Sequence, residues 1–270
     1  MRRCRPLLGT FVDIECDRAE AIDKGFAAIE RVHRLMSAHE PESDLSRVNR
    51  FAHLSPVEVQ PLTARVFERA LFWARESAGA FDPVRAGKSA IERGLLPRHS
   101  DQPAPIASHW TWLEVHGSAV SLLKPGCVDL GGIAKGFAVD QAVAAMRRAG
   151  ASSGLVNAGG DIFAFGPGAW PVTVVHPLTR QPLVEIELCE EALATSALLA
   201  GGSGDHLPGK SEWISVTVNA PSASDADALA KIAWTVLQNS DALLSRCGAR
   251  AFGIRRNGLV EEIAPDRVAA

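Results

Sequence analysis

The stretch 128–140 constrains the fold of this chain more than any other, because a strand end, a glycine turn and a helix start follow one another there without a spare residue. Cys127, Val128 and Leu130 predict the end of a buried strand. Gly150 provides a stop signal for the helix that follows. Before that glycine, alanines recur at helical spacing at Ala134, Ala138, Ala142, Ala145 and Ala149.

The turn in this stretch has the chemistry of an anion site. Gly131 and Gly132 lack side chains, so backbone N–H groups can approach a ligand closely, and the first turn of a helix offers unpaired donors. Lys135 adds a full positive charge, and Asp129 can accept hydrogen bonds from a sugar or base or hold a metal. The spacing matches neither the Rossmann nor the Walker fingerprint. The alternative is a tight strand-to-helix turn beside a solvated lysine.

Charge and cysteine usage exclude several classes of partner. The formal net charge is −3, and no run of Lys or Arg carries interleaved aromatic residues, so nucleic acid is not an expected partner. Five cysteines, an odd number without a C-x-x-C pair, indicate reduced thiols and a cytoplasmic location. The start of the chain is too short in apolar residues for a signal peptide, and no stretch is long enough to span a bilayer.

Hydrophobic periodicity predicts a mixture of helices and hairpins. We expect helices over 21–36, 62–77, 224–237 and 241–246, and strands or hairpins over 8–16, 112–123, 154–162, 170–188, 214–219 and 251–255. Ser224 and Asp227 resemble a capping box, and 84–109 reads as a long irregular connection. The expected fold class is α+β with mixed sheets and packed helices, in a single domain over residues 1–270.

Seven short motifs occur in an order that resembles the ApbE family, the FAD:protein FMN transferases. They are Leu8-Gly-Thr10, Ser43-Asp-Leu-Ser-Arg-Val-Asn49, Gly79-Ala-Phe-Asp-Pro83, Val128-Asp-Leu-Gly-Gly-Ile-Ala-Lys-Gly136, Val156-Asn-Ala-Gly-Gly-Asp161, Ala194-Thr-Ser196 and Ala226-Asp-Ala-Leu229. The resemblance runs from about residue 6 to about residue 252. It implies a T-fold-like α+β fold and a magnesium-dependent splitting of FAD, in which FMN passes to a threonine of a partner protein and AMP is released.

The resemblance also implies the site residues. It implies contacts to the flavin or adenine from Leu8, His39, Ala80, Phe81 and Asp82, and contacts to the nucleotide from Asp129 and Lys135. It implies Mg²⁺ ligands at the Gly132 backbone and the Asp227 carboxylate. A hard cation that bridges a pyrophosphate takes carboxylate and carbonyl oxygens, and it neutralises charge as the phosphoryl group moves.

The sequence departs from the family pattern at two places. Lys231 stands where the family commonly has threonine, and a protonated lysine cannot ligate a cation. We therefore expect its side chain to point away or to take some of the metal's electrostatic role. The family's H-x-x-D-P-x-T-G loop is reduced to 201–210, which retains only His206, Pro208 and Gly209 as an echo.

These departures leave two alternatives to the transferase. A shortened loop would open the phosphorus to water, which predicts an FAD pyrophosphatase that yields FMN and AMP. Loss of both the loop and the threonine would leave a non-catalytic flavin-binding relative. The acceptor protein and the oligomeric state leave no trace in the sequence.

Overall fold

The computed structural model describes residues 1–98, 101–198, 213–235 and 240–263. The chain divides into two compact units. Unit 1 combines Met1–Ile29 with Lys135–Ala270, and unit 2 is the continuous stretch Glu30–Ala134. The single-domain assignment for residues 1–270 stays a prediction. The shortened loop predicted at 201–210 lies outside the described residues.

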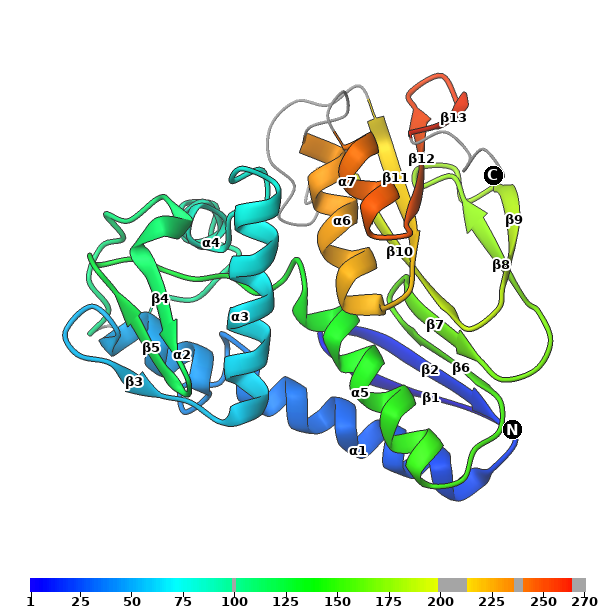
Figure 1. Ribbon diagram of the computed structural model, residues 1–270, viewed down its shortest axis with the longest axis horizontal. Helices are drawn as coiled ribbons and strands as arrows, with labels where there is room; N and C mark the ends of the chain where they lie inside the picture. Colours follow the sequence, from blue (N-terminus) through cyan, green and yellow to red (C-terminus); the bar gives the residue numbers. More distant parts are fainter. Residues whose placement is uncertain (99–100, 199–212, 236–239, 264–270) are drawn as a thin grey trace. The chain divides into compact units, whose positions relative to one another are not determined.

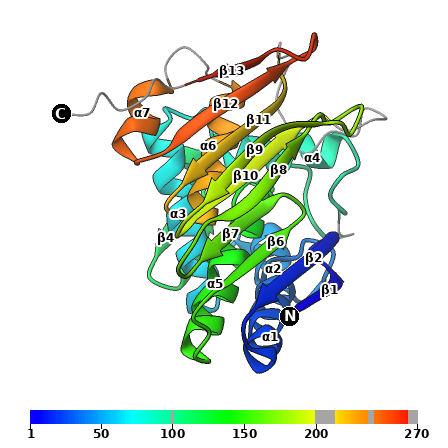
Figure 2. The ribbon, with the colours of Figure 1, turned by 90° about the vertical axis from the view of Figure 1, so that its right-hand side faces the viewer.

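A single large antiparallel sheet forms the centre of unit 1 (Figure 2). In spatial order, the described strands are β1 (Arg2–Leu7), β2 (Thr10–Cys16), β6 (Gly154–Ala158), β7 (Asp161–Phe165), β10 (Glu191–Ala197), β11 (Trp213–Ala220), β12 (Arg250–Arg255) and β13 (Val260–Glu262). The N-terminal hairpin therefore lies beside a strand from the middle of the chain, and Val12 faces Ala158 across that pairing. Every residue of β7 is buried, because both faces of the sheet are covered at this strand.

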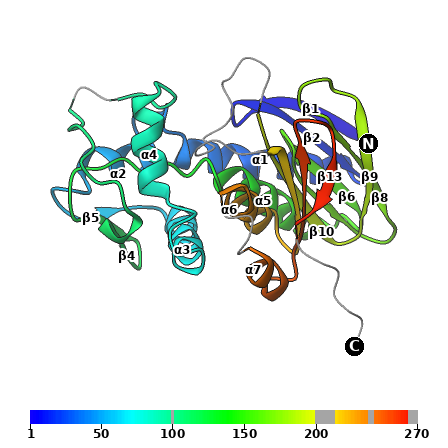
Figure 3. The ribbon, with the colours of Figure 1, turned by 90° about the horizontal axis from the view of Figure 1, so that it is seen from above.

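Helices cover one face of this sheet and a hairpin covers the other (Figure 3). The helical side holds α5 (Ala134–Arg148), α6 (Ala223–Thr235) and the first part of α1 (Ala19–Met36), and α7 (Asp241–Arg246) precedes β12. On the other side lies the hairpin of β8 (Trp170–Val175) and β9 (Pro182–Leu188). Side chains of this hairpin and of the sheet form an apolar core made of Ile162, Ala164, Val174, Leu188, Leu193, Ile214 and Ile254.

Unit 2 is a small helical assembly around a short sheet (Figure 1). Its helices are α2 (Asp44–Phe51), α3 (Pro61–Glu76) and α4 (Pro83–Glu92), with a 3₁₀ turn, η1, at Trp110–Trp112. The sheet order is β3 (Val57–Glu58), β5 (Ala119–Leu122) and β4 (Leu113–His116). The helix predicted over 62–77 is confirmed as α3, and its apolar residues Val66, Phe67, Ala70, Leu71 and Ala74 are all buried.

The α+β class is confirmed, and three local predictions are corrected. The strand predicted from residue 8 begins at Thr10, because Leu8 and Gly9 form a turn with φ of 57° and 71°. Residues 127–130 are extended but belong to no strand. The stretch 84–109 is not wholly irregular, since α4 occupies its beginning. No helix within the described ranges is both long and apolar enough to cross a membrane.

The helix α4 begins where a strong local signal stands. Asp82 precedes it in an extended conformation, and its Oδ1 accepts hydrogen bonds from the backbone N–H groups of Val84 at 3.0 Å and Arg85 at 2.9 Å. Pro83 occupies the first helical turn, where its missing N–H costs nothing. The capping aspartate followed by proline therefore starts a helix inside a stretch that lacks clear periodicity.

Candidate functional site

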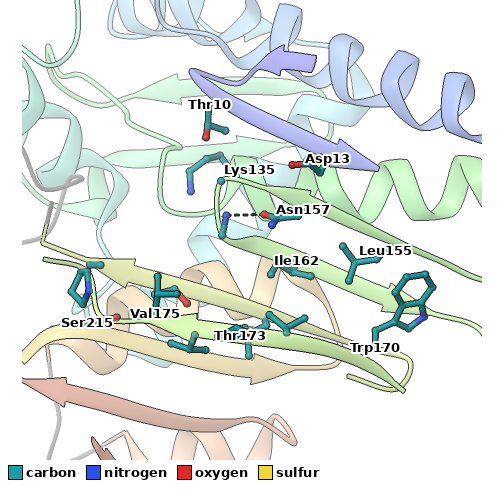
Figure 4. A pocket seen from close by; sticks show the side chains of 18 of the residues that line it. Thr10, Asp13, Lys135, Leu155, Asn157, Ile162, Trp170, Thr173, Val175 and Ser215 are labelled. Carbon is teal, nitrogen blue, oxygen red and sulfur yellow. Dashed lines mark hydrogen bonds between the residues drawn. The ribbon is translucent and has the colours of Figure 1, made fainter. Parts of the chain in front are cut away.

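A pocket of about 970 Å³ opens in unit 1 beside the hairpin β8–β9. We call it the sheet pocket. Its volume lies at the upper end of the range typical of small-molecule sites. Figure 4 shows its side chains converging from the sheet strands and from β8. Among the residues that line this pocket are Leu8, Thr10, Lys135, Leu155, Asn157, Ile162, Trp170, Leu193, Thr195 and Ser215.

The walls of the sheet pocket are half apolar and half polar. Ile162, Leu155 and Leu193 contribute aliphatic surface, and Trp170 adds an indole ring at one end (Figure 4). The Oγ of buried Ser215 has no hydrogen-bond partner in the described part of the chain. A flat heteroaromatic ring with polar edges is the kind of ligand that such a lining accommodates, because apolar faces and separate hydrogen-bonding groups are both present.

The polar end of the pocket is held in place by the turn between β6 and β7. Asn157 Oδ1 accepts a hydrogen bond from the backbone N–H of Gly160 at 2.9 Å (Figure 4). Gly159 has φ of 65°, and a Cβ on it would lie 2.6 Å from the Oγ1 of Thr10. Only glycine fits there, so this turn and the start of β2 approach each other at the pocket wall.

Lys135 joins the sheet pocket to a group of charged residues that we call the charge cluster: Lys135, Asp161, Asp227 and Lys231. Lys135 Nζ donates to Asp161 Oδ2 at 2.6 Å, and Lys231 Nζ donates to Asp227 Oδ1 at 2.9 Å. The side chains of Asp161 and Asp227 are 1% and 0% exposed. Two carboxylates and two ammonium groups therefore balance each other within the fold.

The pKa values of the two carboxylates of the charge cluster shift in opposite directions. Burial first, and repulsion from Asp227 second, raise the pKa of Asp161 to about 6, against the attraction of Lys135 and Lys231. Burial alone would also raise the pKa of Asp227. The charges of Lys231 and Lys135 and the hydrogen bond from Lys231 outweigh burial there, so the pKa of Asp227 is lowered. Asp227 thus carries the negative charge of the cluster most firmly.

A close contact between two helix starts positions this cluster. A Cβ on Gly136 would lie 2.1 Å from the carbonyl oxygen of Ala223, so α5 and α6 meet backbone to backbone. The Asp140 carboxylate of α5 accepts hydrogen bonds from the N–H groups of Ala223 at 2.8 Å and Ser224 at 2.9 Å. The start of α6 is therefore capped by the carboxylate of Asp140 from another helix and by Ser222 Oγ, which accepts from the N–H of Asp225 at 3.2 Å. The capping box predicted from Ser224 and Asp227 is wrong, and Asp227 is free to serve the charge cluster.

In unit 2, Asp129 lies in a segment that side chains hold extended. The side chain of Asn49 forms the two hydrogen bonds with the Val128 backbone that a neighbouring strand would form. Its Nδ2 donates to the carbonyl of Val128 at 3.0 Å, and its Oδ1 accepts from the Val128 N–H at 2.7 Å. The N–H of Asp129 donates to the carbonyl of Pro83 at 2.9 Å. Its Oδ1 accepts from the N–H of Gly131 at 2.7 Å, which closes the glycine turn.

Of the other FAD and metal contacts predicted in unit 2, Ala80, Phe81 and Asp82 directly precede α4, whereas His39 and Gly132 lie in separate turns. Phe81 and Asp82 are buried, and Ala80 is half-buried. Asp82 Oδ2 also accepts from the N–H of Trp110 at 3.1 Å, so both its carboxylate oxygens serve the fold. His39 is exposed in a turn, where its N–H donates to Ser37 Oγ at 3.2 Å. Gly132 is half-buried in the glycine turn.

The structure thus brings some predicted residues together. Leu8 and Lys135 line the same pocket, and Lys135 and Asp227 belong to the same charge cluster. Asp161 carried a signal in the sequence, since it ends one of the family-like motifs, but no role was predicted for it. Asn157 stands in that motif too. Trp170 and Ser215 gave no signal, because only the tertiary fold brings β8 and β11 to one pocket.

The charge cluster does not fit a divalent cation in the arrangement shown. Asp227 Oδ1 is bound by Lys231, and Oδ2 accepts from the N–H of Gly136 at 3.3 Å. Across the described ranges, no group of three or more His, Cys, Asp or Glu residues is arranged to hold a metal. Mg²⁺ needs several oxygen ligands in near-octahedral geometry, and an ammonium group supplies none.

Comparison with known proteins gives a consistent set of relatives. The sequence model of the ApbE family matches residues 8–200. The chain is 28% identical to an FAD:protein FMN transferase of Treponema pallidum, over 83% of this chain and 74% of that protein. It is 26% identical to an FAD:protein FMN transferase of Haemophilus influenzae, over 75% of this chain and 68% of that protein.

Solved structures confirm the fold class. The flavin transferase ApbE of Vibrio cholerae superposes with a TM-score of 0.80 at 23% identity, covering 97% of this chain and 96% of the other. The flavinyl transferase ApbE of Pseudomonas stutzeri, in its apo form, gives 0.83 at 20% identity, with 97% and 94% covered. The ApbE protein of Thermotoga maritima gives 0.83 at 22% identity, with 97% and 96% covered.

Proposed function

The chain belongs to the ApbE family, and we propose that it is an FAD:protein FMN transferase. In the proposed reaction, a threonine hydroxyl of an acceptor protein attacks the FMN phosphorus of FAD. The new P–O bond forms as the pyrophosphate bond breaks, AMP leaves, and the hydroxyl proton passes to a base. The names of the two sequence relatives support this reading.

The observation that carries the proposal is the position of Lys135 at the wall of the sheet pocket. Its side chain is 26% exposed and remains paired with Asp161, so its ammonium is both fixed and accessible. A fixed cation stabilises the charge that develops on the bridging and leaving oxygens during phosphoryl transfer. Leu8, in the turn before β2, also lines the pocket and offers an apolar contact to the ring system. We propose both residues as FAD contacts.

Several finer parts of the proposal rest on the resemblance alone. The threonine acceptor and the contacts from His39, Ala80, Phe81, Asp82 and Asp129 stay predictions of this kind. The cytoplasmic location, which rests on the cysteine usage, also stays a prediction. Mg²⁺ with ligands at Gly132 and Asp227 is also a prediction of the resemblance. Because the charge cluster in this arrangement does not fit Mg²⁺, no step of the proposed reaction involves a metal.

The test is an incubation of the purified chain with FAD and a flavoprotein domain that carries a candidate threonine. We expect a fluorescent flavin band on a denaturing gel and release of AMP, and both should vanish when the threonine is replaced by alanine. AMP release without any acceptor would identify the pyrophosphatase alternative instead. FAD binding without AMP release would identify the non-catalytic relative, and the transferase proposal would then be withdrawn.

A further inference from the structure

The charge cluster contains a cation of its own at the place where the resemblance predicts a metal. Lys231 stands one helical turn after Asp227 on α6, and its Nζ lies 2.9 Å from Asp227 Oδ1. The side chain of Lys231 is only 11% exposed and that of Asp227 is fully buried. A lysine in this position is a fixed part of the interior and not a solvated surface charge.

Both oxygens of Asp227 are already engaged by the protein. Lys231 binds Oδ1, and the backbone N–H of Gly136 donates to Oδ2 at 3.3 Å. The other buried carboxylate of the cluster, Asp161, is held by Lys135 at 2.6 Å. A divalent cation that bound Asp227 would therefore have to share these oxygens with the Lys231 ammonium or displace it.

Charge balance points in the same direction. Two carboxylates and two ammonium groups sum to zero within the cluster. Without an anionic ligand beside it, a divalent cation added to this cluster would leave an excess of positive charge in a buried site, and burying unbalanced charge is costly. Replacing Lys231 by threonine would give the opposite situation, because it would leave Asp227 with a net negative charge and add a hydroxyl oxygen beside it.

We propose that Lys231 permanently takes the place of the divalent cation in this chain, so that its reaction with FAD proceeds without a metal. The proposal rests on the proposed function for the reaction, but not for metal binding itself. Lys231 acts as a positioning residue. It neutralises the buried carboxylate of Asp227, while Lys135, which lines the sheet pocket, is paired with Asp161.

The experiment compares metal binding and AMP release in one set of proteins stripped of metal with EDTA. The variants are Lys231→Thr, which frees Asp227, and the matched control Lys24→Thr, at an exposed position of α1. Binding is followed without FAD by the electron paramagnetic resonance signal of free Mn²⁺. AMP release from FAD is followed with EDTA and with Mg²⁺.

We expect the unaltered chain and Lys24→Thr to show no saturable Mn²⁺ binding and equal AMP release with EDTA and with Mg²⁺. Lys231→Thr should gain saturable Mn²⁺ binding, lose about tenfold or more of its AMP release in EDTA, and recover it with Mg²⁺. Saturable Mn²⁺ binding by the unaltered chain, or AMP release abolished by EDTA, would overturn the proposal. If no protein releases AMP, the proposed function fails, and the Mn²⁺ titration of the unaltered chain still decides the inference.

Discussion

Gly136 and Ala223 touch through their backbones, since a Cβ on Gly136 would lie 2.1 Å from the Ala223 carbonyl oxygen. This contact lets Asp140 cap α6 and lets the N–H of Gly136 reach Asp227. The glycine at this position of the family-like motif therefore has a packing reason. A side chain there would separate the two helix starts on which the charge cluster depends.

The substitution Gly136→Ala tests the contact with Ala223, because the contact determines whether the free energy of unfolding rises or falls. In an open helix interior, glycine to alanine stabilises a protein by roughly 0.5–1 kcal/mol. Here we expect a loss of about 3 kcal/mol in the free energy of unfolding, because the added methyl group collides with a backbone oxygen. Urea denaturation measures the change, and a gain in stability would contradict the contact.

Asp227→Asn tests the buried ion pair. The variant leaves the Lys231 ammonium without its anion, so we expect a loss of about 3 kcal/mol in the free energy of unfolding. Asp225→Asn, the same substitution in the first turn of α6, is the matched control and should change stability by less than about 1 kcal/mol. The double variant Asp227→Asn/Lys231→Met should recover much of the loss. Equal losses in Asp227→Asn and Asp225→Asn would show that the pair contributes nothing specific.

Asp161 predicts a particular dependence of stability on pH. Its pKa is raised from 3.8 to about 6, so between these values the folded chain keeps a proton that the unfolded chain releases. Stability from this group is therefore fully present below about pH 4 and is lost as the pH rises through about 6. Asp161→Asn lacks the titration. The stability of the unaltered chain relative to Asp161→Asn should fall by on the order of 2 kcal/mol across that window.

Urea denaturation at several pH values, for both proteins, gives the difference curve for Asp161. Subtracting the variant removes the other titrating carboxylates to a first approximation, including Asp227, whose lowered pKa acts in the opposite sense. A difference that stays level or rises with pH would show that Asp161 is ionised throughout.

Lys135 is expected to bind the anionic part of FAD. To avoid leaving Asp161 as an unpaired buried charge, the double variant Lys135→Gln/Asp161→Asn is compared with Asp161→Asn alone. We expect the double variant to bind FAD about thirtyfold more weakly, which corresponds to about 2 kcal/mol for a charge-assisted hydrogen bond. Quenching of flavin fluorescence reports the affinity. Lys24→Gln serves as the control for loss of one positive charge, and equal affinities of the two Asp161 variants would remove Lys135 from the FAD contacts.

Local patterns in the sequence predicted most elements of this fold. Helices such as α3 and α5 carry a clear periodicity and end at glycine signals, Gly79 and Gly150. The apolar residues of 127–130 predict the end of a strand, but the segment belongs to none. Its actual partner is the side chain of Asn49, and a hydrogen bond across so long a stretch of sequence leaves no periodic signal. The signal for α4 existed in Asp82 and Pro83, but the prolines further on obscured it.

The candidate site was predictable where one short motif contained the whole interaction. Asp227 and Lys231 stand four residues apart, the spacing at which helical side chains meet, so their pairing could have been derived from the sequence. The partner of Lys135 could not, because Asp161 lies on a strand beyond the helix. Asp140 as the cap of α6 was equally inaccessible, since Ser224 and Asp227 offered a local alternative that the tertiary structure does not use.

The assembly of unit 1 from Met1–Ile29 and Lys135–Ala270 sets an order of events on the ribosome. β2 has no neighbour except β1 until Gly154–Ala158 emerge and pair with it. Unit 2, a continuous stretch, leaves the ribosome in the meantime and can complete its own sheet first. A half-built hairpin with one open edge must therefore wait through the synthesis of the whole of unit 2. The second strand of the chain thus gains its second neighbour only after all of unit 2 has been synthesised.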